Sequence, residues 1–193
     1  MNVESYLKTI GFKSFEGHVC CIAKKVSDLI KLTSVSDINV MQIGFNAGHS
    51  AEIMLENNSS LKLTSFDLGS HSYVIPANDY ISKRYPGRHE LILGDSTITL
   101  PKYMDKKFDV IFIDGGHTYF LATTDLQNCK RFAHENTIVI MDDTMHTLGW
   151  ETDFTIGPTK AWTDAISKNE IIELGHEDYM AKRGGISWGK YIL

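Results

Sequence analysis

The segment Val110-Ile111-Phe112-Ile113-Asp114 is a short apolar run that ends in an acid, and the same pattern recurs along the chain. Three further runs of this form occupy residues 63–67, 91–95 and 139–143, and a fifth run at 40–44 ends in a glycine instead. Short continuous apolar runs are typical of strands buried on both faces, as in a parallel sheet covered by helices. Ligands of such sheets bind beyond the carboxyl ends of the strands. We therefore expect one Gly-rich turn and five carboxylates at a common edge.

Composition limits the classes of protein to which the chain can belong. Its 193 residues suit one domain, and 42% hydrophobic with 22% charged residues is ordinary for a globular protein. A formal charge of -5 with scattered Lys and Arg argues against a nucleic-acid partner. The cysteines Cys20, Cys21 and Cys129 lack a metal-binding spacing and cannot all pair, which favours a reducing compartment. No targeting segment or membrane-spanning run is visible, so we expect a cytoplasmic protein without a membrane partner.

Periodicity predicts alternating strands and helices. Apolar residues at helical spacing predict a helix over residues 17–32. The expected elements that follow are a strand at 38–44, a helix from residue 50, a strand at 61–67, a helix at 76–84, strands at 89–93 and 108–114, a helix before a strand at 137–141, an irregular stretch at 144–159, a helix at 159–168, and strands at 170–174 and 185–192. This order predicts an α/β three-layer sandwich. The connection to the last strand is too short for a crossover helix, which favours an antiparallel final strand.

The turn after the first predicted strand has glycines where a bound cofactor would need them. Gly44 permits a tight turn, Gly48 permits close approach of the backbone to a ligand, and Asn46 tolerates a positive φ. Asp67 ends the next strand, and a carboxylate there can accept hydrogen bonds from both hydroxyls of a ribose. An ordinary βα turn and a solvated loop acid are the alternatives. The turn lacks the full G-x-G-x-x-G pattern, which lowers the case for NAD.

An ordered set of motifs resembles a known family. The motifs are residues 40–50, Asp67, residues 94–96, the segment Ile113-Asp114-Gly115-Gly116-His117-Thr118-Tyr119, and Asp142-Asp143. Together they look like class I S-adenosylmethionine-dependent methyltransferases, closest to the small-molecule O-methyltransferase branch with an Ile-Asp-Gly-x-His-x-Tyr segment and a double acid after strand five. The resemblance covers roughly residues 38–190. It implies a Rossmann-like, seven-stranded sheet of order 3-2-1-4-5-7-6 with strand 7 antiparallel.

The resemblance also implies where the cofactor binds. The turn would hold the methionine portion of S-adenosylmethionine, Asp67 the ribose, and Asp95 with Ser96 the adenine edge. The full set of expected cofactor contacts is Gly44, Phe45, Asn46, Ala47, Gly48, His49, Ser50, Asp67, Leu68, Asp95, Ser96, Asp114 and His117. Two positions depart from the family pattern, since Gln42 stands where an acid is frequent and Asn46 where Gly is frequent. We expect one domain, with an N-terminal helical segment at 1–36 and a core at 37–193.

Three carboxylates at neighbouring strand ends predict a cation site. Asp114, Asp142 and Asp143 would repel one another unless they are protonated, separated or bridged by a cation. Oxygen ligands suit Mg²⁺ or another hard divalent ion. By resemblance to metal-dependent O-methyltransferases, that ion would also contact the acceptor oxygen. The alternative is that Asp114 serves the cofactor alone while Asp142 and Asp143 cap a turn.

Two histidines are candidates for the base that removes the acceptor proton. His117 follows two glycines, and His146 begins the irregular stretch; either imidazole could act as a general base at neutral pH or complete a metal shell. The alternatives are a histidine at the start of a helix for His117 and a solvated loop histidine for His146. Trp150 and Phe154, in the same stretch, are candidates for an apolar wall of the acceptor pocket.

These observations predict an S-adenosylmethionine-dependent methyltransferase that methylates a hydroxyl of a small molecule with help from a divalent cation. One alternative keeps the cofactor and uses a histidine as sole base. A second is a non-catalytic module that binds S-adenosylmethionine, and a third, weaker one is a nicotinamide oxidoreductase. The N-terminal helix could build a homodimer contact.

Overall fold

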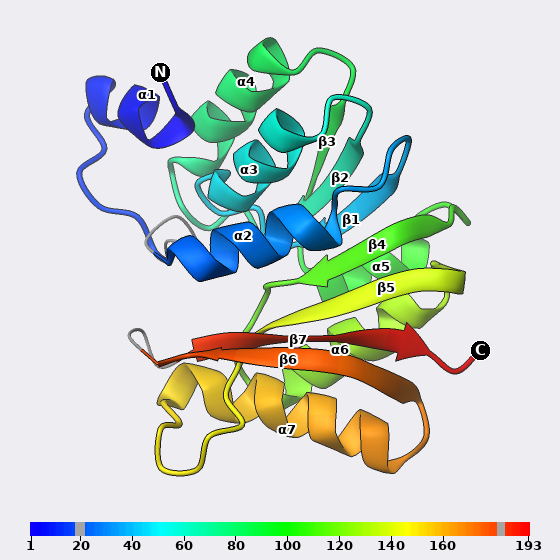
Figure 1. Cartoon of the computed structure of the whole chain (residues 1–193). Helices are drawn as coiled ribbons and strands as arrows, with labels where there is room; N and C mark the ends of the chain where they lie inside the picture. Colours follow the sequence, from blue (N-terminus) through cyan, green and yellow to red (C-terminus); the bar gives the residue numbers. More distant parts are fainter. Residues whose placement is uncertain (18–21, 181–183) are drawn as a thin grey trace. The chain divides into compact units, whose positions relative to one another are not determined.

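We describe the protein from a computed structural model, which covers residues 1–17, 22–180 and 184–193 (Figure 1). The strands are β1 (Asn39–Ile43), β2 (Lys62–Asp67), β3 (His89–Leu93), β4 (Phe108–Ile113), β5 (Ala133–Thr144), β6 (Ile171–Tyr179) and β7 (Gly184–Tyr191). They form a seven-stranded sheet of order β3-β2-β1-β4-β5-β7-β6, in which β7 is antiparallel to β5 and β6. The predicted α/β class, strand order and antiparallel final strand are confirmed. The chain forms two compact units, residues 1–95 and 96–193.

The first unit is a parallel three-stranded layer covered by helices. Its helices are α1 (Val3–Thr9), α2 (Ala23–Leu32), α3 (His49–Asn57) and α4 (Val74–Arg84). In β1 every residue after the first is buried, and in β2 every residue except the first and the last is buried, as expected for strands covered by packed side chains. α3 packs against β2, and α4 packs against β3. The carboxyl ends of β1 and β2 are in register, with Ile43 opposite Phe66, so the segments that follow them start side by side.

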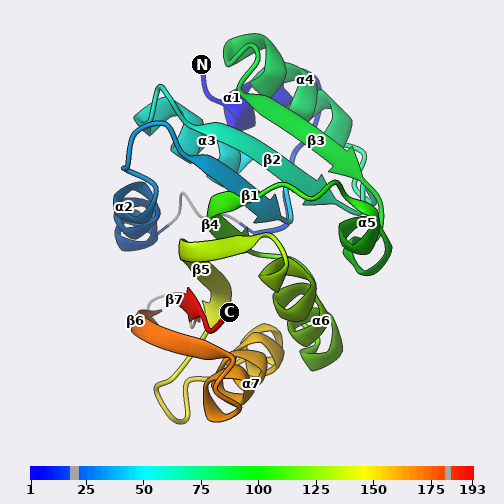
Figure 2. The ribbon, with the colours of Figure 1, turned by 90° about the vertical axis from the view of Figure 1, so that its right-hand side faces the viewer.

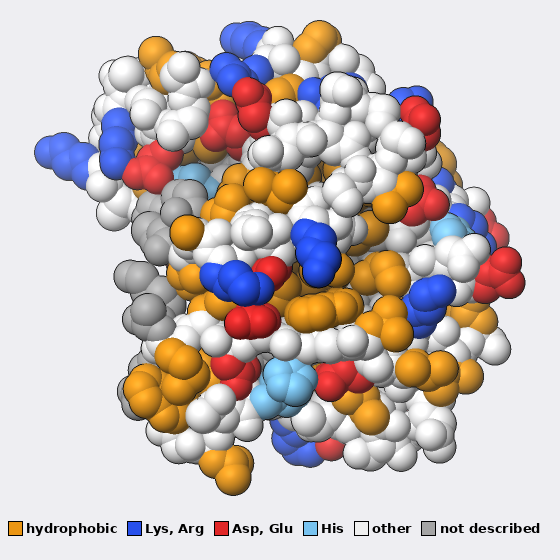
Figure 3. Space-filling model, viewed as in Figure 1, with side chains coloured by type: hydrophobic (Ala, Val, Ile, Leu, Met, Phe, Trp, Pro, Cys, Tyr) orange, Lys and Arg blue, Asp and Glu red, His pale blue; other side chains and the backbone are white. Residues whose placement is uncertain are grey.

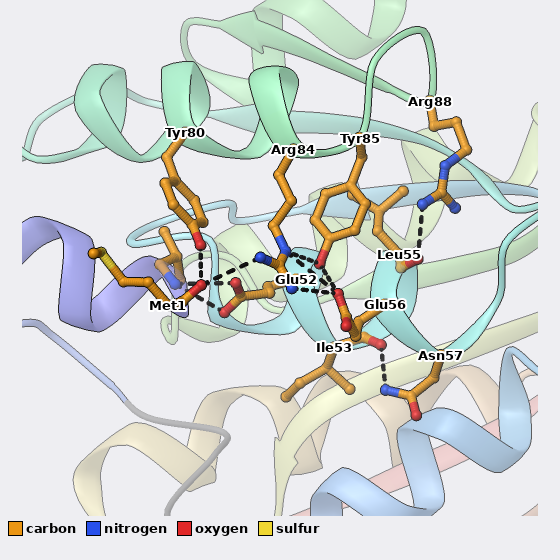
Figure 4. Close-up of polar contacts among 11 residues, drawn as sticks. Met1, Glu52, Ile53, Leu55, Glu56, Asn57, Tyr80, Arg84, Tyr85 and Arg88 are labelled. Carbon is orange, nitrogen blue, oxygen red and sulfur yellow. Dashed lines mark hydrogen bonds and ion pairs between the residues drawn. The ribbon is translucent and has the colours of Figure 1, made fainter.

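Polar contacts fasten the N-terminal helix to α3 and α4 (Figure 4). The backbone N–H of Val3 donates to both carboxylate oxygens of Glu52, at 3.0 Å each, and burial raises the pKa of Glu52. The hydroxyl of Tyr80 donates a hydrogen bond to the carbonyl of Met1. The guanidinium of Arg84 donates one hydrogen bond to the same carbonyl and another to the carboxylate of Glu56. The N-terminal segment is therefore part of the first unit.

The second unit combines parallel and antiparallel pairing. β4 and β5 are parallel, and the helices are α5 (Ser96–Lys102), α6 (Tyr119–Lys130) and α7 (Asp153–Ser167). Figure 2 shows α6 and α7 side by side; α6 packs against β4, and α7 packs against β5 and β6. Thr118 caps α6, because its side chain accepts a hydrogen bond from the backbone N–H of Leu121.

Some element boundaries differ from the sequence prediction. α7 begins at Asp153, well before the predicted residue 159, so the stretch expected to be irregular is partly helical. Gly157-Pro158 is usually a loop signal, but here both residues lie within the helix. β5 and β6 extend beyond their predicted ends, and α5 was not predicted. α2 starts at Ala23; the earlier part of the predicted 17–32 helix at 18–21, with Cys20 and Cys21, lies outside the described residues.

Two further findings concern the described residues. The thiol of Cys129 is buried, and burial raises its pKa well above the ordinary value. Within residues 1–17, 22–180 and 184–193, none of the helices has the length and apolar character needed to cross a membrane.

Candidate functional site

In the first unit, the glycine turn between β1 and α3 adopts the conformation that its sequence predicts. Gly44, Asn46 and Gly48 have φ values of 91°, 52° and 78°, in the left-handed region that favours Gly and Asn. A Cβ on Gly48 would lie 3.0 Å from Cζ of Phe45, so a larger residue would also meet a packed ring. The turn therefore brings the backbone tightly around the end of β1.

Asp67 holds this turn against the end of β2. Its Oδ2 accepts hydrogen bonds from the backbone N–H groups of Phe45 at 2.9 Å and Asn46 at 2.7 Å, and its Oδ1 accepts one from Gly69 at 2.7 Å. A carboxylate offers about four acceptor positions. Asp67 therefore orders the turn and keeps acceptor capacity for a further donor, such as a ribose hydroxyl.

Gln42 is a structural residue beneath the turn. It is fully buried, and its side-chain N–H₂ donates to the carbonyl of Gly44 at 2.7 Å and to Oγ of Ser50 at 2.6 Å. Its carbonyl oxygen accepts a hydrogen bond from Ser65 at 3.2 Å. The amide thus needs no charged partner, which explains how the chain accommodates Gln where the resembled family often has an acid.

Two buried polar atoms beside the turn have no hydrogen-bond partner among the described residues, namely Oδ1 of Asn46 and Nδ1 of His89. The ring of His89 stacks on Phe45 with centroids 5.0 Å apart, and burial lowers the pKa of His89 to about 4. Buried polar atoms are normally paired, so unsatisfied ones at a turn suggest a missing polar ligand. The residues present therefore fit a polar cofactor at this turn.

The segment before α2 covers the turn, a feature that sequence reasoning missed. Asn46 donates its side-chain N–H₂ to the carbonyl of Glu16 at 2.5 Å, and the N–H of Glu16 donates to the hydroxyl of Tyr73 at 3.2 Å. The ring of Phe15 lies 5.9 Å from that of His49 and 5.4 Å from that of Tyr73. Phe15 and Glu16 belong to no helix or strand, so their contacts follow no regular spacing that the sequence could reveal.

The remaining predicted cofactor contacts differ in exposure. Ala47 and Ser50 are buried next to the turn, Leu68 is exposed immediately after β2, and Asp95 is exposed shortly after β3. Ser96 is the first residue of α5 in the second unit.

In the second unit, the ends of β4 and β5 bring Asp114, His117 and Asp143 together. One ligand atom of each residue lies within 4.8 Å of the others, and Nε2 of His117 is 3.0 Å from Oδ2 of Asp143. β4 and β5 are parallel with Ile113 opposite Met141, so the residues that follow both strands emerge at one edge. The group can hold a cation, or it can act as an aspartate–histidine pair.

Asp142 lies outside this group, although the sequence suggested it as a third ligand. Asp142 is 2% exposed and pairs with Ile186 of β7, whereas Asp143 has a φ of 54° at an irregularity in the β5–β7 register between Asp142 and Thr144. Neighbouring residues of a strand point to opposite faces. The irregularity therefore presents Asp143, and not Asp142, to Asp114 and His117.

α7 fixes the backbone that carries His117. A Cβ on Gly157 would lie 2.1 Å from the carbonyl oxygen of His117 and 2.6 Å from the backbone nitrogen of Tyr119. Tyr119 donates its hydroxyl to Asp164 of the same helix at 2.7 Å, and the ring of Phe154 lies 6.0 Å from that of His117. Phe154 and Trp150 are both partly exposed.

His146, the second candidate base, belongs to a different group of side chains. One of its ligand atoms lies within 4.8 Å of those of Glu173 and His176, and its ring stacks on His176 with centroids 4.3 Å apart. Burial, and next the proximity of His176, lower the pKa of His146. The structure thus separates the two predicted histidines into two groups of the second unit.

Comparison with known proteins identifies the relatives of this fold. A family model described as a methyltransferase domain matches residues 41–144, which is more than half of the chain. No curated protein sequence matches the chain significantly. Cofactor-bound Rv0187 from MTB is similar with a TM-score of 0.74 and 14% identity, over 98% of this chain and 87% of that one. An O-methyltransferase from Bacillus cereus in complex with SAH has a TM-score of 0.73 and 14% identity, over 97% of this chain and 89% of that one. SAH-bound methyltransferase PaMTH1 from Podospora anserina has a TM-score of 0.68 and 17% identity, over 86% of this chain and 77% of that one. At these identities the likeness establishes the fold.

Proposed function

Because the chain belongs to the methyltransferase-domain family, we propose that it transfers the methyl group of S-adenosylmethionine to a hydroxyl oxygen of a small molecule. The observation that carries the chemistry is the group of Asp114, His117 and Asp143, which combines two carboxylates and an imidazole within 4.8 Å. The solved O-methyltransferase from Bacillus cereus, which shares the fold, supports the choice of an oxygen acceptor. The family match crosses the boundary between the two units, which supports a single catalytic domain at 1–193.

In this proposal the first unit binds the cofactor. Bound S-adenosylmethionine supplies an electrophilic methyl group on a sulfonium. The left-handed turn at residues 44–48 brings backbone close to the methionine portion, and the remaining acceptor position of Asp67 receives a ribose hydroxyl. Oδ1 of Asn46 and Nδ1 of His89 are further polar contacts, since they have no partner among the residues described.

Asp114, His117 and Asp143 activate the acceptor hydroxyl. When bound, a divalent cation there lowers the pKa of a hydroxyl and orients its oxygen. The donor set is mixed rather than all-oxygen, so it favours Mn²⁺ or another ion that accepts imidazole over Mg²⁺. The acceptor oxygen would bond to the methyl carbon as the carbon–sulfur bond breaks, which leaves S-adenosylhomocysteine, and the hydroxyl proton would pass to solvent water. Correct placement of oxygen and methyl supplies much of the rate.

A metal-independent mechanism is the second candidate, and the 3.0 Å contact between Nε2 of His117 and Asp143 favours it. If Nε2–H donates to Asp143, the neutral ring of His117 carries its lone pair on Nδ1, and this nitrogen is the proposed acceptor of the hydroxyl proton. Asp143 then holds the tautomer and stabilises the charged ring. His146 has no part in either mechanism, because it lies with Glu173 and His176.

Replacing Asp67 with Ala tests the cofactor site. We expect the affinity for S-adenosylmethionine to fall about 10- to 100-fold, because hydrogen bonds to a charged acceptor contribute about 1.5–3 kcal/mol. Asp67→Asn keeps one acceptor oxygen and should lose less. Calorimetric titration measures both, with exposed Asp79→Ala in α4 as the matched control. Affinity in Asp67→Ala equal to that of the wild type would remove Asp67 from the cofactor site.

Chelation separates the two mechanisms. If a cation assists, EDTA should abolish methyl transfer to an acceptor, and Mn²⁺ should restore it better than Mg²⁺. Binding of S-adenosylmethionine should persist under chelation, since Asp67 and the glycine turn contain no cation ligand in this proposal. Turnover that survives EDTA unchanged would favour His117 as sole base.

Surface charge agrees with a small-molecule acceptor. On the face shown in Figure 3, Lys and Arg side chains are interspersed with Asp and Glu, without a continuous basic area over the parts coloured by type. Partly exposed Trp150 and Phe154 offer apolar surface in the second unit, Phe154 near His117. We propose that they contact the apolar part of the acceptor.

A further inference from the structure

A second group of metal-ligating side chains lies in the second unit, apart from the three residues assigned to methyl transfer. It consists of His146, which follows β5, and Glu173 and His176 in β6. One ligand atom from each lies within 4.8 Å of the others, and Nδ1 of His176 is 3.2 Å from Oε1 of Glu173. His146 and Glu173 are half-buried, whereas His176 is exposed and leaves the group open to solvent.

A bulge in β6 creates this group. Residues three apart in a regular strand point to opposite faces, so Glu173 and His176 should not meet. The pairing of β6 with β7 shifts between Glu173 and Gly175, since these residues oppose Gly189 and Trp188 while Leu174 has no partner in the register. The additional residue shifts the alternation of side chains between the two faces of the strand by one position, so Glu173 and His176 share a face.

The bulge is supported by close packing on the neighbouring strand. A Cβ on Gly175 would lie 2.5 Å from the ring of Trp188, so Gly175 allows the indole to pack directly against the backbone of β6. His176 lies opposite Ser187, which also contacts His146. β6 therefore carries Glu173 and His176, and Ser187 of β7 holds His146 beside them.

Hydrogen bonds fix the orientation of two members of the group. The indole N–H of buried Trp162 donates to Oε2 of Glu173 at 2.6 Å, and Nε2 of His146 lies 2.8 Å from Oγ of Ser187. Ser187 is in turn 3.0 Å from Oγ1 of Thr144, and both hydroxyls are buried. If Nε2–H of His146 donates to Ser187, Nδ1 keeps its lone pair. Outer hydrogen bonds of this kind orient the ligands of metal sites.

Asp178 holds the backbone that carries His146. Its carboxylate accepts hydrogen bonds from the backbone N–H of His146 at 3.1 Å and from the backbone N–H of Thr147 at 2.8 Å. The start of the loop is thus fixed to β6, the strand that carries the other two residues.

We propose that His146, Glu173 and His176 form a second metal site, which binds a divalent transition-metal ion such as Zn²⁺. Two imidazoles and one carboxylate are ligands that zinc accepts, and three protein ligands leave a fourth position for water or another small ligand. The exposed edge of His176 provides an entry path for the ion. This proposal does not depend on methyl transfer, because none of its residues takes part in that reaction.

Cobalt and zinc titrations test the site. Co²⁺ binding is followed by visible absorption and Zn²⁺ binding by calorimetry, in an Asp143→Asn background so that the other cation group does not contribute. We expect this background to bind one ion per chain. Adding His176→Ala or Glu173→Gln should raise the Kd more than about 100-fold, beyond the range of changes in outer hydrogen bonds.

The control is His134→Ala, which removes an aspartate-paired histidine elsewhere in the second unit and should leave binding unchanged. Circular dichroism checks that each variant folds, and the exposure of His176 makes unfolding of His176→Ala unexpected. The proposal is overturned if the Asp143→Asn background binds no ion, or if folded His176→Ala and Glu173→Gln bind it as tightly as the background.

Discussion

Replacing Asp143 with Asn should lower the rate of methyl transfer by about 100-fold or more, the effect typical of a lost acid–base group. The substitution removes the charge that faces Nε2 of His117 at 3.0 Å. It does so whether Asp143 holds a cation or orients the imidazole. Asn is well suited to the φ of 54° at this position, so the backbone should keep its conformation.

The measurement is single-turnover methyl transfer together with titration of S-adenosylmethionine. Cofactor affinity should stay at the wild-type value, because Asp143 is not one of the residues proposed to hold S-adenosylmethionine. The matched control is Asp109→Asn, which removes another aspartate–histidine contact in the second unit, at 3.2 Å from His134. Equal rates in Asp143→Asn and the wild type would exclude Asp143 from the reaction.

Gly157→Ala should destabilise the protein by about 3 kcal/mol and abolish most activity, although Ala is the better helix former. Helix propensity alone would favour Ala by about 1 kcal/mol. The new Cβ, however, would lie 2.1 Å from the carbonyl oxygen of His117 and 2.8 Å from the carbonyl carbon of Thr118. These are backbone atoms that cannot rotate away, so the segment with His117 or α7 must move, at the cost typical of overpacking.

Urea unfolding measures the loss of stability, and the rate at saturating cofactor measures the displacement of His117. Ile156→Ala is the matched control, because this neighbour in α7 is exposed and should change stability by less than about 0.5 kcal/mol. A free energy of unfolding equal to that of the wild type in Gly157→Ala would contradict the prediction, because it would mean that α7 and the segment at 117–119 can move apart at no energetic cost.

The central strands β1, β2 and β4 were predictable from the sequence because they are covered on both faces. A covered strand needs consecutive apolar residues, and β4 with five buried residues of six is such a case. β6 was harder to delimit, since buried and exposed residues alternate irregularly around its bulge. The start of α7 was missed for a related reason: Gly157-Pro158 reads as a turn, yet the glycine is there for contact with the segment at 117–119.

The sequence predicted which types of residue form the candidate site, but it did not predict which of the candidate residues come together. All three residues of the group were singled out: Asp114 and Asp143 because each ends an apolar run, and His117 because it follows two glycines. The choice between Asp142 and Asp143 depends on a bulge with a positive φ, which no periodicity reveals. Glu173 and His176 were passed over because their spacing of three has no meaning in a regular strand.

The irregularity in β6 has a further consequence for how the molecules behave in concentrated solution. β6 is the last strand in the order, and such a border offers backbone groups to which a second polypeptide can bond. An inserted residue in its middle breaks the even spacing that a foreign strand would need to extend across it. The kink that gathers Glu173 and His176 should therefore also discourage neighbouring chains from adhering along this margin.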